Sequence, residues 1–165
     1  MRESQQKTEK IIADLSKNVG GINNSLGQLT ETLFSGELWK LFHKYNIEFT
    51  KQAPRVQFIQ NKQVIAEADY FLENGDCAMP VEVKTALSIN DVDNHLARID
   101  KIRRYMDGRN DMRKLYGAVA GGVVTKNVME YAQSKGLYVI VQTGESITTA
   151  DPPAGFSVRE WTFET

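Results

Sequence analysis

One short stretch near the middle of the chain restricts the fold more than any other: residues 67–85, EADYFLENGDCAMPVEVKT. Two runs of alternating residues flank Asn74-Gly75 there, and both of these residues accept the positive φ angles of a type I′ turn. The pattern predicts an antiparallel hairpin with strands over about 64–73 and 76–85, in which Glu73 lies opposite Asp76. We therefore expect a β-sheet at the centre of the fold.

This register sorts the side chains of the hairpin into two faces, because opposed residues share a face. The first face is nearly all apolar and carries Ala68, Tyr70, Leu72, Cys77, Met79, Val81 and Val83. The second face is charged and carries Glu67, Asp69, Glu82 and Lys84. Glu67 is expected opposite Glu82, and Asp69 diagonal to Glu82, with Cα atoms about 7–8 Å apart. Pro80 has no N–H to donate, so we expect a bulge or frayed pairing beside it.

The flanking sequence predicts helices and further strands around this hairpin. A helix is expected over 25–45, a first strand within 49–58, and a polar turn from Gln60 to Gln63. A second helix should begin at Asn90, with Asp93 completing a variant of the capping box, and end at Gly108. The remaining expected elements are a strand over 115–120, a Gly121-Gly122 turn, a helix over 126–135, a strand over 137–142 parallel to the previous one, and an alternating segment at 158–163.

The N-terminal segment has a heptad seam. Apolar residues recur at steps of four and three: Leu15, Val19, Ile22, Leu26, Leu29 and Leu33. This spacing favours a coiled coil, so we expect residues 1–24 to pair two chains into a homodimer and residues 25–165 to form the main domain. The alternative is an amphipathic helix that packs on its own domain.

Composition excludes several classes of protein. The net charge is −1, so any contact with nucleic acid has to come from a local basic patch. The lone cysteine, Cys77, rules out an internal disulfide framework and is expected to be an inert strand residue. The chain shows neither a zinc-ligand spacing, nor the apolar core of a signal peptide, nor a membrane-length segment. We expect a cytoplasmic protein with no membrane contact.

The charged face of the hairpin carries the chemistry. Carboxylates grouped on one patch repel each other unless protons or a cation compensate, and hard oxygen ligands suit Mg²⁺ or Mn²⁺. A lysine beside such a metal can orient a water and stabilise developing negative charge, which is what hydrolysis of a phosphodiester needs. The alternative is that Glu82 and Lys84 belong to an alternating solvent face.

The arrangement resembles the PD-(D/E)XK nuclease superfamily, which has the restriction-endonuclease-like fold. Asp69, preceded here by Ala68 in place of proline, matches the first acid of the family motif, and Glu82-Val83-Lys84 matches its E-x-K element. The resemblance implies an α/β fold with a mixed sheet, an antiparallel meander plus a parallel βαβ unit, flanked by helices. It also implies that Asp69, Glu82 and the carbonyl of Val83 bind Mg²⁺ and that Lys84 positions the attacking water. Glu31 is the match for an additional glutamate on the first helix, with Glu37 in reserve.

The segment after the E-x-K element is rich in cations. Between His95 and Tyr116 lie Arg98, Lys101, Arg103, Arg104, Arg109, Arg113 and Lys114. We expect Arg98, Lys101 and Arg104 to contact nucleic acid, together with His95, which stands where several branches of the family have glutamine; the alternative is a solvated helix face. The sequence thus predicts a metal-dependent nuclease with DNA as the expected substrate. The competing hypothesis is a non-catalytic nucleic-acid-binding or coiled-coil assembly module that retains the fold.

Overall fold

The computed structural model describes residues 36–165. The predicted coiled coil over 1–24, the domain boundary that follows it, and Glu31 all lie outside the described residues.

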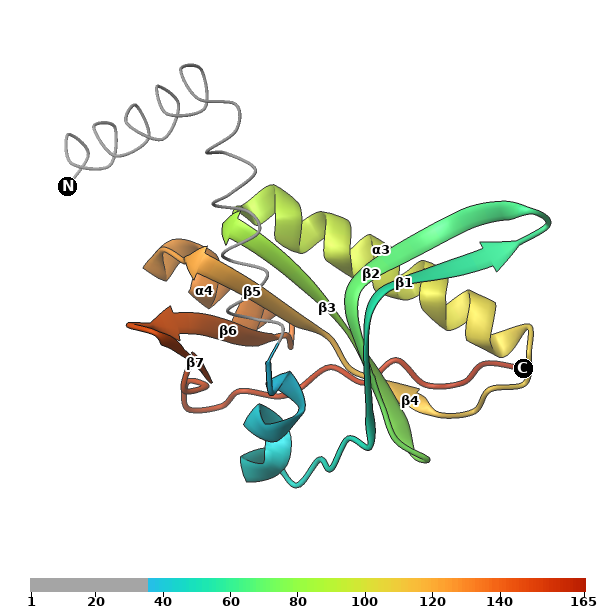
Figure 1. The fold of residues 1–165 in the computed structure, drawn as a ribbon, viewed down its shortest axis with the longest axis horizontal. Helices are drawn as coiled ribbons and strands as arrows, with labels where there is room; N and C mark the ends of the chain where they lie inside the picture. Colours follow the sequence, from blue (N-terminus) through green and yellow to red (C-terminus); the bar gives the residue numbers. More distant parts are fainter. Residues whose placement is uncertain (1–35) are drawn as a thin grey trace, which may run out of the picture.

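A mixed sheet forms the centre of the fold (Figure 1). Its strands are β1 (Lys51–Gln60), β2 (Gln63–Glu73), β3 (Cys77–Ala86), β4 (Lys114–Leu115), β5 (Ala118–Val123), β6 (Tyr138–Thr143) and β7 (Ser146–Thr149). The spatial order is β1-β2-β3-β5-β6-β7, and β4 pairs with β3. The meander β1–β2–β3 and the β6–β7 pair are antiparallel, whereas β3–β5 and β5–β6 are parallel.

Helices cover both faces of this sheet. On one face the 3₁₀ helix η1 (Leu38–Tyr45) buries Leu38 and Phe42 against strand residues such as Met79 and Ile140. On the other face α3 (Ile89–Asp107) and α4 (Lys126–Ser134) bury Ile99 and Val128, among other side chains, in a second apolar cluster. The order meander, α3, β5, α4, β6 is the order that the resemblance implies. The predicted fold class, a restriction-endonuclease-like mixed sheet flanked by helices, is therefore confirmed by the topology.

Helix α3 starts two residues earlier than the sequence suggested. The N-cap is Ser88, whose hydroxyl accepts a hydrogen bond from the backbone N–H of Asp91 at 3.1 Å. The Asp91 carboxylate in turn accepts the backbone N–H of Ser88 at 3.0 Å, which completes a capping box. The predicted cap at Asn90 with Asp93 is wrong, because Ser88 and Asp91 form the capping box two residues upstream. The predicted end at Gly108 is confirmed.

Three other boundaries differ from expectation. The strand predicted over 115–120 is divided between β4 and β5, and the predicted Gly121-Gly122 turn lies inside β5. A Cβ at Gly122 would stand 2.9 Å from the carbonyl oxygen of Thr85, so glycine permits the close approach of β5 to the end of β3. The alternating segment over 158–163 forms a single bridge between Trp161 and Leu115. Within the predicted 25–45 helix, the described part is the 3₁₀ turn η1.

The β1–β2 hairpin extends as an arm beyond the rest of the sheet (Figure 1). Its two-residue loop is Asn61-Lys62, within the predicted polar turn, and both residues have positive φ angles of 53° and 65°. Pairing between β2 and β3 begins only at Tyr70, so the part of the hairpin from Val56 to Ala68 pairs only with itself.

Among the helices that the structure describes, none is both long enough and apolar enough to cross a membrane.

Candidate active site

The β2–β3 hairpin has a different register from the predicted one. The observed pairs are Tyr70↔Val81, Phe71↔Pro80, Leu72↔Met79 and Glu73↔Ala78, so Gly75 and Asp76 form the loop. The reason lies in the Asn74 side chain, whose Oδ1 accepts the backbone N–H groups of Asp76 and Cys77, both at 2.8 Å. This Asx turn moves the loop one residue along the chain. The pairing therefore shifts by two residues, and because two is even, Asp69, Glu82 and Lys84 keep the same side of the sheet.

The predicted position of Glu67 opposite Glu82 is wrong. The β2–β3 ladder ends at Tyr70 and Val81, and Glu67 instead pairs with Gln57 of β1 and is exposed. Ala68, predicted on the apolar face with Tyr70, is buried in the opposite cluster, with α3. The two residues are buried on opposite sides because β2 changes direction between them, at Asp69. Across from this point Arg55 has a positive φ of 50°.

Asp69 is located where β2 separates from β3. Its Oδ2 accepts the backbone N–H of Val83 at 2.8 Å, so the carboxylate bridges the two strands where the ladder has ended. This contact fixes the side chain beside the Glu82-Val83-Lys84 segment of β3. Asp69 thus contacts the Glu82-Val83-Lys84 segment through its side chain, and it does not form the predicted diagonal strand pair with Glu82.

Glu82 is a buried carboxylate with two cations at its oxygens. It is 6% exposed, its Oε2 lies 2.6 Å from Nη1 of Arg98, and its Oε1 lies 3.5 Å from Nζ of Lys84. Burial raises the pKa of Glu82, and the charge of Asp69 raises it further, whereas Arg98 and Lys84 lower it. Asp69 and Glu82 are therefore close enough to repel each other, which is the electrostatic condition that a bound cation relieves.

His95 holds Arg98 against Glu82. The ring is fully buried; Nε2 donates to the carbonyl oxygen of Pro80 at 3.1 Å, and Nδ1 accepts from Nη1 of Arg98 at 3.0 Å. Burial and then the adjacent guanidinium lower the pKa of His95 to about 3, so the ring is neutral and one tautomer satisfies both contacts. His95 was expected to contact nucleic acid, but in this structure its ring contacts Pro80 and Arg98 inside the protein. Only its spacing of three from Arg98 on the same helix indicated the pairing in advance.

The cations after the E-x-K element divide into an internal and an external group. Arg103 is buried, and its guanidinium donates to Asp107 and to the carbonyl oxygens of Asp111, Arg113 and Trp161. Arg113 is paired with Asp111 and Glu73. Lys101 and Arg104, in contrast, are exposed on α3. Of the three predicted phosphate contacts, these two face solvent and Arg98 is engaged at Glu82.

Glu37 and Cys77 are two other residues that the sequence singled out. Glu37, the reserve candidate for the additional glutamate, pairs with Lys40 at 2.9 Å at the start of η1. Cys77 is buried, and burial raises the pKa of its thiol, which disfavours the reactive thiolate.

The donor set around Asp69 fits a hard divalent cation. The carboxylates of Asp69 and Glu82 lie where β2 and β3 separate, and Mg²⁺ is commonly held by only one or two carboxylates plus waters and substrate phosphates. Within the part of the chain that the structure describes, no group of three or more His, Cys, Asp or Glu side chains forms a closed metal cage. Asp69 and Glu82 are therefore the carboxylates here that could hold such an ion.

Comparisons with known proteins give two distant structural likenesses. A repair endonuclease from Pyrococcus abyssi has a TM-score of 0.39 and 12% sequence identity, over 72% of this chain and 48% of that one. The small subunit of the heterodimeric restriction endonuclease R.BspD6I has a TM-score of 0.34 and 10% identity, over 72% of each chain. This chain thus corresponds to about half the length of the first of these enzymes. No protein-family model and no curated protein matches the sequence.

Proposed function

We propose that this protein is a metal-dependent nuclease that hydrolyses phosphodiester bonds of DNA. The observation that carries the proposal is the buried Glu82, which lies beside Asp69 on one side and beside Lys84 on the other, at the point where β2 and β3 separate. Placing a carboxylate inside the protein next to a second carboxylate is unfavourable for folding, so a solvent face does not explain it.

In this proposal the residues of the site would have separate roles in metal binding and in orienting the attacking water. Asp69, Glu82 and the carbonyl oxygen of Val83 would hold Mg²⁺ or Mn²⁺, with Glu31 assisting through water or at a second ion. Once bound, the ion supplies positive charge that polarises the phosphate and lowers the pKa of a coordinated water. Lys84, whose side chain is 46% exposed, would orient the attacking water from the solvent side of the site.

Arg98 would keep Glu82 ionised in the free protein. A buried carboxylate with a raised pKa binds a proton more readily, and the guanidinium 2.6 Å away opposes this. His95, neutral and fixed by Pro80, would set the position of the guanidinium. We regard Arg98 as a positioning residue for the ligand Glu82, and Lys101 and Arg104 as the phosphate contacts.

A second candidate function follows from the same ion pair. The Arg98 guanidinium lies 2.6 Å from Glu82 and offsets its charge, a pairing that would also suit a protein that keeps the fold for nucleic-acid binding or assembly without catalysis. In that case the N-terminal coiled coil would be the main functional element of the protein.

A cleavage assay on a mixed pool of DNA separates the two candidates. For the nuclease, we expect cleavage with Mg²⁺, none with a chelator, and a loss of at least about a hundredfold in Lys84→Met, in the range typical of a lost general acid–base group. Lys126→Ala is the matched control, since Lys126 is an exposed lysine of α4 that pairs with Glu130, and it should cleave normally. Metal-independent behaviour, or a Lys84→Met variant as active as Lys126→Ala, would favour the non-catalytic module.

A further inference from the structure

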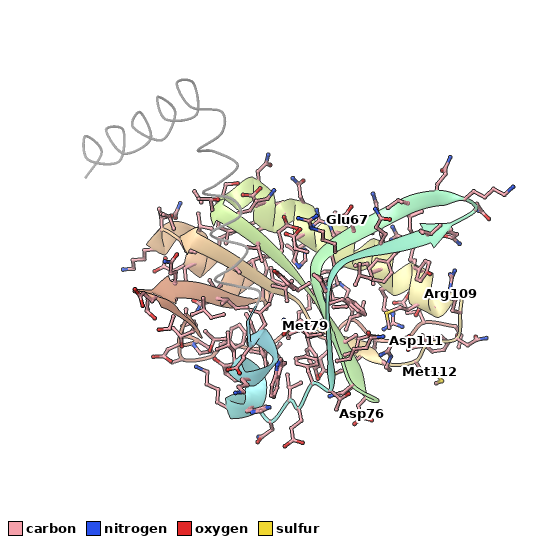
Figure 2. All side chains as sticks on the ribbon, viewed as in Figure 1. Glu67, Asp76, Met79, Arg109, Asp111 and Met112 are labelled. Carbon is pink, nitrogen blue, oxygen red and sulfur yellow. The ribbon has the colours of Figure 1, made fainter. Side chains whose placement is uncertain are left out.

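The arm formed by β1 and β2 packs over the C-terminal half of α3. The Phe58 ring contacts the Tyr105 ring edge-to-face at 5.3 Å, and the Arg109 guanidinium lies 3.7 Å over the Tyr105 ring. Arg109 also donates to the carbonyl oxygen of Ile59 at 3.4 Å. In Figure 2, Glu67 is labelled near the base of the arm and Arg109 near the end of α3, with the side chains of the arm extending outward between them.

An open groove of about 580 Å³ runs between the arm and the helix. Among the described residues, the arm side is lined by Gln60, Gln63, Val64 and Ile65, and the helix side by Lys101, Arg104 and Tyr105. Gln60 and Gln63 face each other across the end of the hairpin, and Val64 is 51% exposed. The groove thus combines two amides, an exposed apolar side chain and two cations.

The arm contains no negative charge over most of its length. The stretch 49–66 has neither Asp nor Glu, although the whole chain has 21 acidic residues, and it contains Lys51, Arg55 and Lys62. With Lys101 and Arg104 on the facing helix, the groove complements a polyanion in a chain whose net charge is −1.

The groove chemistry favours duplex DNA over a single strand. A two-stranded β-ribbon fits the major groove, where glutamine can bind adenine with two hydrogen bonds and an apolar group can contact the methyl of thymine. Single-strand grooves instead offer aromatic faces on which bases stack. The aromatic side chain of this groove, Tyr105, already contacts Phe58 and carries Arg109.

We propose that the β1–β2 arm enters the major groove of duplex DNA and reads A·T base pairs through Gln60, Gln63 and Val64, while Lys101 and Arg104 bind the adjacent backbone. This inference rests on the proposed nuclease function and deepens it by naming the form of the substrate and the element that reads it. Asp69 lies six residues from Gln63 along β2, a path of at most about 20 Å. Since DNA rises about 3.4 Å per base pair, the cut would fall within about six base pairs of the pairs that are read.

The first test measures binding without cleavage, using the full chain with Lys84→Met and a pool of short duplexes with a randomised centre. Selection should enrich A·T pairs, and replacing adenine in the selected duplex with 7-deazaadenine, which lacks the N7 acceptor, should weaken binding. The Gln60→Ala/Gln63→Ala variant should bind the selected duplex about ten- to a hundredfold more weakly and should no longer respond to 7-deazaadenine. Gln57→Ala is the matched control, because Gln57 precedes Phe58 on β1 and faces away from α3.

The second test addresses the backbone contacts. Lys101→Ala/Arg104→Ala should weaken binding to all duplexes alike and reduce the slope of log K against log salt by about two, since each lost phosphate contact removes about 0.9. Lys126→Ala should leave the slope unchanged. Tighter binding of single strands than of duplexes, a salt slope unchanged in the double variant, or a loss in Gln60→Ala/Gln63→Ala no larger than in Gln57→Ala would overturn the proposal.

The two proposals fail in different ways. If the wild-type protein binds A·T duplexes through Gln60 and Gln63 but never cleaves DNA, the arm proposal stands and the nuclease proposal is lost. If the protein cleaves DNA but substituting Gln60 and Gln63 does not change its affinity for duplexes, the nuclease proposal stands and the role of the arm is refuted.

Discussion

At the scale of single residues, Glu82 has the most demanding position in the candidate site. It is buried, it is near Asp69, and it contacts Arg98 and Lys84 through different oxygens. Removing one partner of a buried ion pair leaves the other charge without compensation, which is more harmful than removing both. The Glu82–Arg98 pair therefore offers two variants that break the same contact and differ in what remains for a metal.

The first prediction compares Glu82→Gln with Arg98→Ala in their response to Mg²⁺. Both variants lose the ion pair, but only Arg98→Ala keeps both carboxylates. At about a hundred times the dissociation constant, binding adds about 2.7 kcal/mol of stability, or roughly 5–10 °C in Tm for a chain of this size. We expect this rise in the wild type and at least as large a rise in Arg98→Ala, and none in Glu82→Gln. Melting curves with and without Mg²⁺ measure it, and equal rises in the two variants would contradict the assignment of Glu82 as a ligand.

The second prediction concerns pH and His95. The pKa of this ring falls from 6.5 to about 3 in the folded protein. Between these values the unfolded chain binds one more proton than the folded chain, so His95 makes the free energy of unfolding decrease as the pH falls, by up to about 1.4 kcal/mol per pH unit. Urea denaturation at several pH values should show a shallower decrease in His95→Gln, which does not titrate. Groups whose surroundings are the same in both proteins cancel in the difference, and parallel pH profiles would show that His95 is not buried in its neutral form.

The sequence could place Asp69, Glu82 and Lys84 on one side of the sheet, but it could not predict which residues they contact. Side-chain alternation along a strand survives an even shift of register, so the charged face was recognisable even though the pairing was wrong. The contact of Asp69 with the backbone of Val83 and the contact of Arg98 with Glu82 depend on where β2 bends and how α3 crosses the sheet. Neither of these is encoded in local periodicity.

At the scale of elements, α3 connects the candidate site to the arm. Its first turn starts at the Ser88 capping box, its middle carries His95 and Arg98, and its second half carries Lys101 and Arg104. The sequence correctly placed the helix and its end, but it favoured Asn90 over Ser88 as the cap. Both residues are good N-caps by type, and each is followed by Asp three residues later, so the local pattern does not choose between them.

The third prediction tests this cap with a pair of variants. Ser88→Ala removes the hydroxyl that accepts the Asp91 N–H and should lower the free energy of unfolding by about 1 kcal/mol. Asn90→Ala, within the first turn and exposed, should change it by less than about 0.5 kcal/mol. Denaturant unfolding measures both, and a larger loss in Asn90→Ala would mean that the helix begins where the sequence pattern first suggested.

The two hairpin turns show most clearly what could not be predicted from the sequence. Asn74-Gly75 has the composition of a type I′ loop, but Asn74 uses its side chain to bond the backbone two and three residues ahead, and the loop becomes Gly75-Asp76. The Asn61-Lys62 loop has no glycine, yet both residues adopt positive φ and the strands pair on either side. The Asn74 side chain sets the first loop, and the second forms without glycine, so turn composition alone identifies neither loop.

At the scale of the whole molecule, the proposed nuclease has one candidate site per chain, whereas its proposed substrate has two strands. A single site of this kind cuts one strand at a time, so a protein that breaks both strands together needs two copies of the site. The heptad pattern from Leu15 to Leu33 lies outside the described residues and predicts a coiled coil that would pair two chains. Assembly and the outcome of cleavage are therefore expected to change together.

The last prediction changes the seam alone. Leu15→Lys/Ile22→Lys places two charges at apolar seam positions, which strongly disfavours pairing of the helices and leaves residues 36–165 unaltered. Light scattering should give twice the 18.6 kDa chain mass for the wild type and the single mass for the variant. On a supercoiled plasmid with Mg²⁺, the wild type should produce linear DNA early, whereas the monomeric variant should accumulate nicked circles. Equal masses for both proteins would show that the seam does not join two chains, and early linear product from a proven monomer would show that one site can cut both strands.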